Sequence, residues 1–559
     1  MLPASIQFEA ALRVIKTLRA CGHQAFLAGG CVRDLLLNRD PKDYDVATSA
    51  TPDIVLALFP RTFAVGAHFG VVLVADTNET GAPAGAQLAP PQVVTEVATF
   101  RSDGAYSDGR HPDAVRYTTS AEEDVRRRDF TINGLLLDPL QKTDLSSNPR
   151  TAAKLGAPGL EFETWDTTTP SPTQSEPALK GTDFSPYINA TKDEGALALE
   201  ESSKPEPAFP ERQEVSGHDF SRAENEPNSA GALAPEANLR SAVIDHVNGL
   251  ADLNSGIIRA IGRPELRFEE DHLRMLRGVR FAARFNFALD PATQTAIQAL
   301  AHKTAAVSRE RVRDELTKML TEGHARRAFQ LLDATGLLKE VLPEIAKMKG
   351  VEQPPQYHPE GDVFLHTLLL LDQLEPGCSP TLAWGALLHD VGKPPTFRRA
   401  PDRIRFDGHV EVGVAMGAEI LRRFHFSNND TQQILALIQN HMRFADAPRM
   451  RTSTLKRFFR LDNFPEHLAL HRMDCMAASG NLDHYNFVRE RYESMPADSV
   501  RPTPLLTGRE LIAAGYQPGA AFKQILQAVE DAQLEGTIAT LEAAMNFVRE
   551  KFGAPPDPA

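Results

Sequence analysis

The sequence predicts an α+β protein, with a small α/β head followed by segments that are all α-helical. Over the first hundred residues, apolar positions alternate between helical and strand spacing. From Glu265 onward the apolar spacing is helical almost throughout. Between these parts, residues 141–240 hold 11 of the 40 prolines and show no sustained apolar periodicity. We therefore expect that segment to be a disordered, acidic, proline-rich insertion.

The head is expected to begin with a helix over 6–19, where apolar residues recur at helical intervals. A short apolar strand follows at 25–28, and Gly29-Gly30 ends it before a second helical start over 32–37. Three further strands are expected at 44–47, 70–75 and 93–99. The last two are nearly continuous in apolar or β-branched residues, which is typical of buried strands.

The body is predicted from long amphipathic segments at 272–285, 310–320, 325–332 and 365–374. A chain of 559 residues is long enough for about three or four domains. We expect five regions, with a head over 1–140, the insertion over 141–240, a helical neck and body over 241–350, a second helical domain over 351–500, and a helical tail over 501–559.

The charge distribution permits a nucleic-acid partner despite a formal net charge of -14. The insertion accounts for -8 of this total, which leaves -6 over the other 459 residues. Between Arg259 and Lys318 there are 12 basic and 8 acidic residues, and five arginines recur at helical intervals: Arg267, Arg274, Arg277, Arg280 and Arg284. This pattern predicts a basic helical face. A solvated helix with internally paired charges is the alternative interpretation.

Cysteine usage and hydropathy bear on location. The four cysteines include no CxxC pair, so neither a disulfide framework nor a thiolate zinc site is expected. No run approaches 18 uninterrupted apolar residues, so no membrane-spanning helix is expected. A reducing, cytoplasmic compartment fits these features best.

Two carboxylates in the head point to a metal site. Asp43 and Asp45 directly precede apolar Val46-Ala47, and residues i and i+2 of a strand face the same side. Paired carboxylates repel one another unless a cation lies between them, and such pairs hold Mg²⁺ for attack on a nucleotide phosphate. Glu96 lies in the strand expected at 93–99, along which side chains alternate between the two faces, and it could add a third carboxylate to the same metal site. A solvated surface turn is the alternative for an isolated DxD pattern.

The residues around this pair resemble a known family. The runs Gly29-Gly30-Cys31-Val32-Arg33-Asp34 and Arg39 to Asp45 are similar to the signature of class II tRNA nucleotidyltransferases and bacterial poly(A) polymerases. The resemblance implies a polymerase β-like nucleotidyltransferase head in which Asp43, Asp45 and Glu96 are catalytic and bind Mg²⁺. It also implies nucleotide-binding roles for Gly29, Gly30 and Arg33. The run Arg127 to Asn133 resembles the RRDxxxN motif, in which Arg127, Arg128 and Asn133 would bind the triphosphate and Asp129 the ribose.

A second motif lies in the body. Asp271 and Arg274 are three residues apart, so they would share one face of a helix, where an ordinary ion pair is the plain alternative. In the resembled family this motif selects CTP and ATP by hydrogen-bonding the base edge without a nucleic-acid template. The chain departs from the family pattern between Asn133 and Asp245, where about a hundred residues replace a short hairpin.

A second metal site is expected in the 351–500 region. The pair His389-Asp390, together with His366 and Asp474, resembles the HD phosphohydrolase superfamily, in which four such residues bind one divalent cation. His409 and His441 resemble the additional histidines of two-metal members. Mixed imidazole and carboxylate ligands suit Ni²⁺, Mn²⁺, Mg²⁺ or Zn²⁺. For a single histidine on an apolar helix, a hydrogen-bonded core residue is the alternative.

Taken together, the motifs predict an enzyme that adds or repairs the 3′-terminal CCA of tRNA from CTP and ATP, with HD phosphohydrolase activity on 2′,3′-cyclic or 2′-phosphate ends. A tail with 5 basic and 7 acidic residues favours the tRNA enzyme over a poly(A) polymerase, which tends to have a basic extension. Poly(A) polymerase, A-only and CC-only addition remain alternatives. So do a phosphohydrolase with an RNA-binding head and a structural RNA-binding protein, although no metal carboxylate is missing. No pattern predicts an oligomeric state.

Overall fold

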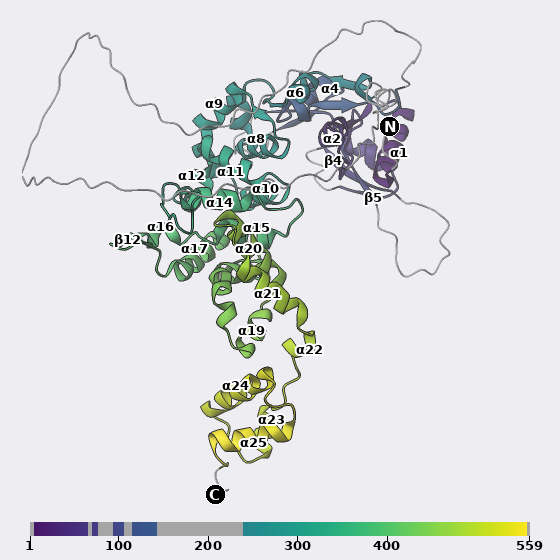
Figure 1. Ribbon diagram of the computed structural model, residues 1–559. Coiled ribbons are helices and arrows are strands. Elements are labelled where there is room, and N and C mark those ends of the chain that lie inside the picture. Colours follow the sequence, from purple (N-terminus) through teal and green to yellow (C-terminus); the bar gives the residue numbers. More distant parts are fainter. Residues whose placement is uncertain (1–4, 65–69, 77–92, 105–113, 142–238, 556–559) are drawn as a thin grey trace, which may run out of the picture. The chain divides into compact units, whose positions relative to one another are not determined.

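The computed structural model describes residues 5–64, 70–76, 93–104, 114–141 and 239–555 (Figure 1). The expected insertion at 141–240 lies almost entirely outside these residues. Within the described residues the head is α/β and the remainder is helical apart from short strand pairs, so the predicted α+β class is confirmed. No helix in the described ranges is long and apolar enough to cross a membrane.

A seven-stranded sheet forms the centre of the head. Strands β2 and β5 run parallel, and every other neighbouring pair is antiparallel. The sheet order is β3 (Thr62–Phe63), β4 (Val71–Asp76), β5 (Val93–Thr99), β2 (Val46–Thr48), β1 (Ala25–Ala28), β8 (Leu135–Leu137) and β9 (Val243–Asp245). Strand β9 follows the insertion and pairs with β8, so the insertion joins two adjacent antiparallel strands, a place where a hairpin turn would suffice.

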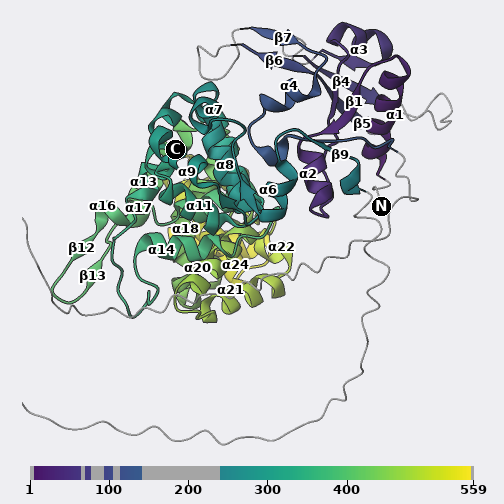
Figure 2. The same cartoon turned by 90° about the horizontal axis from the view of Figure 1, so that it is seen from above.

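Helices cover the sheet and position its loops. α1 (Ile6–Ala20) packs on β5, β1 and β2 (Figure 2). The Ser5 hydroxyl caps α1 by accepting from the Phe8 N–H. α2 (Gly30–Leu36) packs on β1 and β8. The other head elements are α3 (Pro52–Leu58), α4 (Ala121–Arg126), the 3₁₀ turn η2 (Thr131–Asn133) and the separate strand pair β6 (Arg101–Asp103) and β7 (Val115–Tyr117).

The strand expected at 44–47 begins later, at Val46. Asp43 and Asp45 therefore lie in the segment that leads into β2 rather than within a strand. The Asp45 carbonyl still accepts a hydrogen bond from the Ala28 N–H, at 3.0 Å, which fixes the end of this segment to β1.

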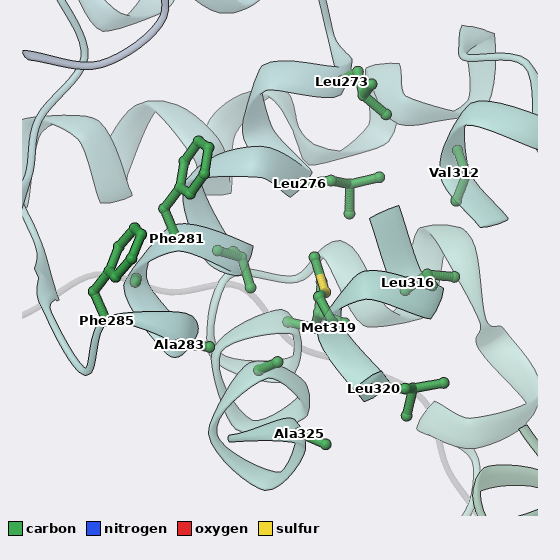
Figure 3. Close-up of a cluster of buried hydrophobic side chains, with 14 of the residues drawn as sticks. Leu273, Leu276, Phe281, Ala283, Phe285, Val312, Leu316, Met319, Leu320 and Ala325 are labelled. Atoms are coloured by element: carbon green, nitrogen blue, oxygen red, sulfur yellow. The ribbon is translucent and has the colours of Figure 1, made fainter. Parts of the chain in front are cut away.

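The neck and body share one apolar core with the head. Side chains of α8, α10 and α11 meet there, among them Leu276, Leu316 and Met319 (Figure 3). The elements are α6 (Gly249–Ser255), β10 (Ile257–Ile258), α7 (Pro264–Glu270), α8 (Leu273–Arg284), β11 (Ala288–Leu289), α9 (Pro291–Leu300), η3 (Ala301–Ala306), α10 (Arg309–Thr321), α11 (Ala325–Ala334), α12 (Leu337–Val341) and α13 (Pro343–Ala346). The strand pair β10 and β11 interrupts an otherwise helical region.

The following region is helical with one hairpin, and several of its helices begin at side-chain caps: Asp362 for α14, Ser379 for α15 and Ser427 for α18. The elements are α14 (Val363–Leu371), α15 (Pro380–Leu388), α16 (Lys393–Thr396), β12 (Arg398–Arg399), β13 (Ile404–Arg405), α17 (His409–Arg423), α18 (Asn428–Asn440), η4 (His441–Arg449), α19 (Thr452–Phe459), α20 (Phe464–Ala477), α21 (Asp483–Ser494), α22 (Ala497–Val500), α23 (Gly508–Ala513), α24 (Ala520–Glu535) and α25 (Leu541–Phe552).

Candidate active sites

The residues predicted for nucleotidyl transfer surround one pocket of about 820 Å³. The head contributes the two glycines, three carboxylates and the arginines of two motifs, and the neck contributes Asp271 and Arg274. The predicted residues that line the pocket are Gly29, Gly30, Arg33, Asp43, Asp45, Glu96, Arg127, Arg128, Asp129, Asn133, Asp271 and Arg274. Arg277, Arg280, Arg284, Arg311 and Lys318 complete a strongly basic lining, which suits a polyphosphate or an RNA backbone.

The three carboxylates form an electrostatically strained group at one side of this pocket. Burial raises the pKa of Asp45 to about 6, and the neighbouring charges of Glu96 and Asp43 add to the effect. Burial and Asp43 likewise raise the pKa of Glu96. A divalent cation would relieve this mutual repulsion, and oxygen ligands of this kind suit Mg²⁺. The donor set therefore fits the metal that the sequence predicts.

A buried carboxylate that the sequence analysis did not single out holds two of the arginines. Asp124 on α4 accepts from Arg127 at 2.6 Å and from Arg128 at 3.0 Å. Burial alone would raise the pKa of Asp124, but the two guanidinium groups lower it below its usual value. Asp124 thus keeps both arginines ordered beside the carboxylates. Its spacing of three and four residues from the pair, on one helical turn, is the signal that could have identified it.

Asp129 is held in place by the neck. Its Oδ2 atom lies 2.7 Å from the Arg277 Nη2 atom, and its Oδ1 atom accepts from the Phe130 N–H and the Asn133 side-chain amide. Burial opposes ionisation, but Arg277 and Asn133 keep the pKa of Asp129 well below its usual range. Arg33 donates to the Asn133 Oδ1 atom at 2.5 Å, which links α2 to the same network.

Gly29 ends β1 in a conformation that favours glycine, with φ of +72°. A Cβ atom added there would stand 3.0 Å from the Arg128 Nη1 atom. The turn therefore needs glycine both for its backbone and for the close approach of Arg128.

The structure differs from the expectation for Asp271 and Arg274, which do not share one helix. α7 ends at Glu270, Asp271 is extended, and α8 begins at Leu273. The Asp271 side chain accepts from the Leu273 N–H at 3.1 Å, so it bonds across the break to the first residue of α8, whose N-cap residue is His272.

Nor do Asp271 and Arg274 form the ordinary ion pair that was the alternative. Asp271 pairs with Arg311 of α10 at 2.8 Å, whereas Arg274 pairs with Glu270 at 2.6 Å. Arg274 also donates to the carbonyl oxygen of Arg127 at 3.3 Å. Each group is thus oriented by its own partner, and both line the pocket.

A second cluster of polar side chains is buried in the region of α14 to α20. His366 lies on α14, His389 and Asp390 directly follow α15, and Asp474 lies on α20. His366, His389 and Asp390 are almost completely buried. The Nε2 atom of His366 is 3.0 Å from the Asp474 Oδ1 atom, and that of His389 is 3.1 Å from the Asp390 Oδ2 atom.

The two additional histidines join the same cluster. His409 begins α17 and His441 begins η4, and their Nε2 atoms are 3.4 Å apart. These atoms lie 3.9 Å and 3.7 Å from the Asp390 Oδ1 atom. The donors form two groups that could each hold a cation, His366 with His389 and Asp474, and Asp390 with His409 and His441. Asp390 faces both groups through its two oxygens.

The histidines are oriented for metal binding by their other ring nitrogen. The Nδ1 atoms of His389, His409 and His441 face the carbonyl oxygens of Ala386, Phe406 and Ile438 at 2.9, 3.0 and 2.7 Å. Because a carbonyl only accepts, Nδ1 carries the proton, and in the neutral imidazole Nε2 then keeps its lone pair. The His389 Nε2 atom is buried and makes no hydrogen bond. This lone pair, aimed at the carboxylates, is what a divalent cation requires, so the residues fit the predicted metal.

Glu360 performs the corresponding role for His366, and the sequence analysis did not identify it. Its Oε1 atom accepts from the His366 Nδ1 atom at 2.7 Å and from the His358 Nδ1 atom at 2.9 Å. Burial disfavours protonation of His366, but hydrogen bonds to Asp474 and Glu360 raise its pKa to about 9. By contrast, burial lowers the pKa of His441 to about 4.

A buried lysine also reaches the cluster. The Lys393 Nζ atom lies 2.7 Å from the Asp390 Oδ2 atom and 2.6 Å from the Gln353 Oε1 atom. It supplies a positive charge beside the shared carboxylate. A positive charge and metal ligands on one buried cluster suit a phosphate group.

Comparison with known protein families agrees with both sites. The poly A polymerase head domain matches residues 25–146, and the probable RNA and SrmB-binding site of polymerase A matches residues 286–349. The HD domain matches residues 363–474, which include His366, His389, Asp390 and Asp474. Both catalytic families are metal-dependent, in agreement with the clustered donors.

Similar proteins include tRNA nucleotidyltransferases of three kinds. The A-adding tRNA nucleotidyltransferase of Deinococcus radiodurans is 34% identical over 327 residues, which is 55% of this chain and 74% of that protein. The CC-adding enzyme of Thermus thermophilus is 35% identical over 315 residues, 54% of this chain and 72% of that protein. The CCA-adding enzyme of Lactobacillus johnsonii is 29% identical over 366 residues, 65% of this chain, and the match spans only 63% of that enzyme's length.

Among solved structures, the CCA-adding enzyme of Bacillus stearothermophilus in complex with CTP matches with a TM-score of 0.59 and 23% identity. The match covers 98% of this chain and 100% of that one, and it supports the same fold. The family resemblance inferred from the motifs is thereby confirmed. The chain belongs to the tRNA nucleotidyltransferase and poly(A) polymerase family and carries an HD domain in its C-terminal half.

Proposed function

We propose that the chain is a template-independent tRNA nucleotidyltransferase that adds or repairs the 3′-terminal CCA from CTP and ATP. The single observation that carries this proposal is the convergence of all twelve predicted residues on one basic pocket. CCA-adding, A-adding and CC-adding enzymes are among the similar proteins, which supports tRNA as the substrate. Open-ended poly(A) addition and partial addition are the less favoured alternatives.

The geometry of the pocket supports a role for each group. Asp43 and Asp45, helped by Glu96, would hold Mg²⁺, which when bound would neutralise charge on the triphosphate. Arg127 and Arg128, ordered by Asp124, lie beside the carboxylates and would stabilise the pyrophosphate that leaves when the RNA 3′-hydroxyl attacks the α-phosphate.

Asp271 and Arg274 of the neck would select the base of the incoming nucleotide. Asp271 and Arg274 present an acceptor and a donor fork toward the pocket, and Arg311 and Glu270 hold them in place. Such a pair can hydrogen-bond the edges of cytosine and adenine in turn.

The addition pattern tests this function. Purified protein and its Asp43→Ala variant are incubated with tRNA ending at the discriminator base, with CTP, ATP or both, and the products are sized on a gel. Addition of C, C and A that stops at three residues is expected for the unmodified protein only. A single A added only to a CC end, or an open ladder of A, would replace the proposal with one of its alternatives. No extension by either protein would refute transfer.

We also propose that the HD region is a phosphohydrolase that acts on 2′,3′-cyclic or 2′-phosphate ends. The two donor groups, with Asp390 in one of them and facing the other, support this second activity. The cation would be Ni²⁺, Mn²⁺, Mg²⁺ or Zn²⁺, because imidazole and carboxylate ligands accept all four. Conversion of 2′,3′-cyclic AMP to 2′-AMP, and release of inorganic phosphate from 2′-AMP, test the activity and rank the metals when each metal is added in turn to metal-stripped protein. The absence of both reactions with every one of the metals would refute it.

A further inference from the structure

A basic hairpin is inserted between the two halves of the HD donor set. Strands β12 and β13 lie between Asp390 and His409 in the chain, and residues 397–408 contain four arginines and two aspartates. In this hairpin Arg398 is directly opposite Arg405. Like charges in directly opposed positions destabilise a strand pair, so this arrangement needs a compensating anion.

The carboxylates around the hairpin compensate its charge only in part. Arg398 pairs with Asp407 at 2.8 Å and Arg399 pairs with Glu352. Asp402 serves two arginines, Arg405 at 2.8 Å and Arg403 at 3.9 Å. Four guanidinium groups thus share three carboxylates, and the Arg405 Nε atom is buried without a hydrogen-bond acceptor. Because exposed ion pairs contribute about 0–1 kcal/mol, phosphate groups could replace these carboxylates at little cost.

Two aromatic rings connect the hairpin to the metal-binding cluster. The ring centroids of Phe397 and Phe406 are 5.9 Å apart, and Phe397 is 37% exposed. The Phe406 carbonyl accepts from the His409 Nδ1 atom, and the Phe406 ring lies 5.5 Å from the Lys393 Nζ atom. The end of the hairpin therefore contacts two groups of the HD cluster directly.

We infer that this hairpin holds the single-stranded end of an RNA against the HD centre. The arginines take up backbone phosphates, and Phe397 stacks on a base next to the terminal phosphate. Arginines beside an exposed aromatic ring are the usual means of binding single-stranded nucleic acid. This inference deepens the proposed phosphohydrolase function and rests on it, because it explains how an RNA end rather than a free nucleotide would be selected.

The test compares an RNA with a small nucleotide on the full-length protein. Hydrolysis of two substrates is measured: an eight-nucleotide RNA ending in a 2′,3′-cyclic phosphate, and 2′,3′-cyclic AMP. The proteins compared are the unmodified protein, the double variant Arg398→Ala/Arg403→Ala and the variant Phe397→Ala. We expect kcat/KM for the RNA, relative to that for cyclic AMP, to fall about tenfold in each variant. Losing two phosphate contacts should also lower the slope of log binding constant against log salt concentration by about 1.4.

Two control variants test whether the effect depends on the place of the arginines in the hairpin and on their charge. Arg422→Ala removes an exposed arginine of α17 that pairs with Glu419, so it should leave both the ratio and the slope unchanged. Arg398→Lys/Arg403→Lys keeps both positive charges, so the dependence of the binding constant on salt concentration should remain nearly as steep as in the unmodified protein.

The possible failures are distinguishable. If the Ala variants match Arg422→Ala in both ratio and slope, the hairpin does not bind RNA and the inference is overturned. If the unmodified protein hydrolyses neither substrate, the phosphohydrolase function is refuted. The affinity of the same variants for the eight-nucleotide RNA, labelled with a fluorophore at its 5′ end and measured by anisotropy, then decides the hairpin's role. Equal affinities for all of them would overturn it.

Discussion

The nucleotidyltransferase pocket and the HD cluster both gather carboxylates, but they do so in opposite ways. In the pocket Asp43 is exposed, and Asp45 is half-buried with a pKa raised to about 6. In the HD cluster His366, His389, Asp390 and His441 are buried and the other two donors are half-buried, and within each group the ligand atoms lie within 4.8 Å of one another. Among the described residues, no such tight group occurs in the head.

The difference indicates how each site acquires its metal. The open carboxylates of the head are surrounded by arginines that would bind a triphosphate, so nucleotide and Mg²⁺ are expected to enter together. The HD cluster has its imidazoles already oriented by backbone carbonyls and by Glu360, so it is expected to bind a cation without substrate.

The largest expected effect separates the two sites completely. Asp390→Asn removes the carboxylate charge that lies between the two HD donor groups, so hydrolysis of 2′,3′-cyclic AMP should fall on the order of 10³-fold, a loss of several kcal/mol of charge stabilisation. CCA addition should persist. Parallel assays of the two activities measure this effect, and a loss of both in a folded variant would show that the sites are coupled.

A smaller effect is expected from Glu360→Gln, which weakens the hydrogen bond that orients His366. Metal affinity of the HD cluster should fall about 10- to 100-fold, as is usual when a carboxylate partner of a ligating histidine is lost. Titration calorimetry with Mn²⁺ in the Asp43→Asn background measures it without the head site. Glu419→Gln, an exposed change on α17, is the matched control and should leave the affinity unchanged.

The two sites should also respond to pH in different windows. Asp45 binds Mg²⁺ only when ionised, so with a pKa of about 6 the Mg²⁺ requirement for addition should rise as pH falls below 6 and be flat above 7. His366 must lose a proton before it ligates a cation, and its pKa is about 9. HD metal affinity should therefore increase by up to tenfold per unit between pH 7 and 9. Flat HD affinity over that range would contradict the account.

The smallest expected effect concerns base choice. Arg311→Met removes the ion-pair partner of Asp271. Because this ion pair is partly exposed, about 1 kcal/mol of the free energy that orients the Asp271 side chain should be lost. Discrimination among CTP, ATP and UTP should weaken about fivefold, as measured by kcat/KM ratios, with HD hydrolysis unchanged. An unaltered ratio would indicate that Arg274 and Glu270 suffice to position the base.

The motifs of the sequence predicted which residues would line the two sites, but not which neighbouring side chains would hold those residues in place. Asp43, Arg128 and Asp271 could be assigned to one pocket because they belong to motifs whose order along the chain is diagnostic. Asp124 and Glu360 are single carboxylates, and only packing makes them partners of Arg128 and His366.

The break between α7 and α8 was missed for a local reason. Helical spacing of Asp271 and Arg274 is compatible with one continuous helix, but the extended Asp271 backbone ends α7 and its side chain accepts from the Leu273 N–H instead. The neck core that supports this break joins α8, α10 and α11, which are distant in sequence, and helical periodicity does not specify how such helices pair.

We propose that one chain carries two independent sites that act on the same RNA end. A tRNA truncated at the discriminator base and ending in a 2′,3′-cyclic phosphate tests it directly, in the presence of CTP, ATP, Mg²⁺ and Mn²⁺. Hydrolysis of the 3′ P–O bond must free the 3′-hydroxyl before any nucleotide can be added. We expect the unmodified protein to add CCA to this cyclic-ended tRNA. The Asp390→Asn variant should not extend it, but should add CCA to a tRNA that already ends in a 3′-hydroxyl. Extension of the cyclic end by Asp390→Asn, or failure of the unmodified protein to extend it, would contradict the claim.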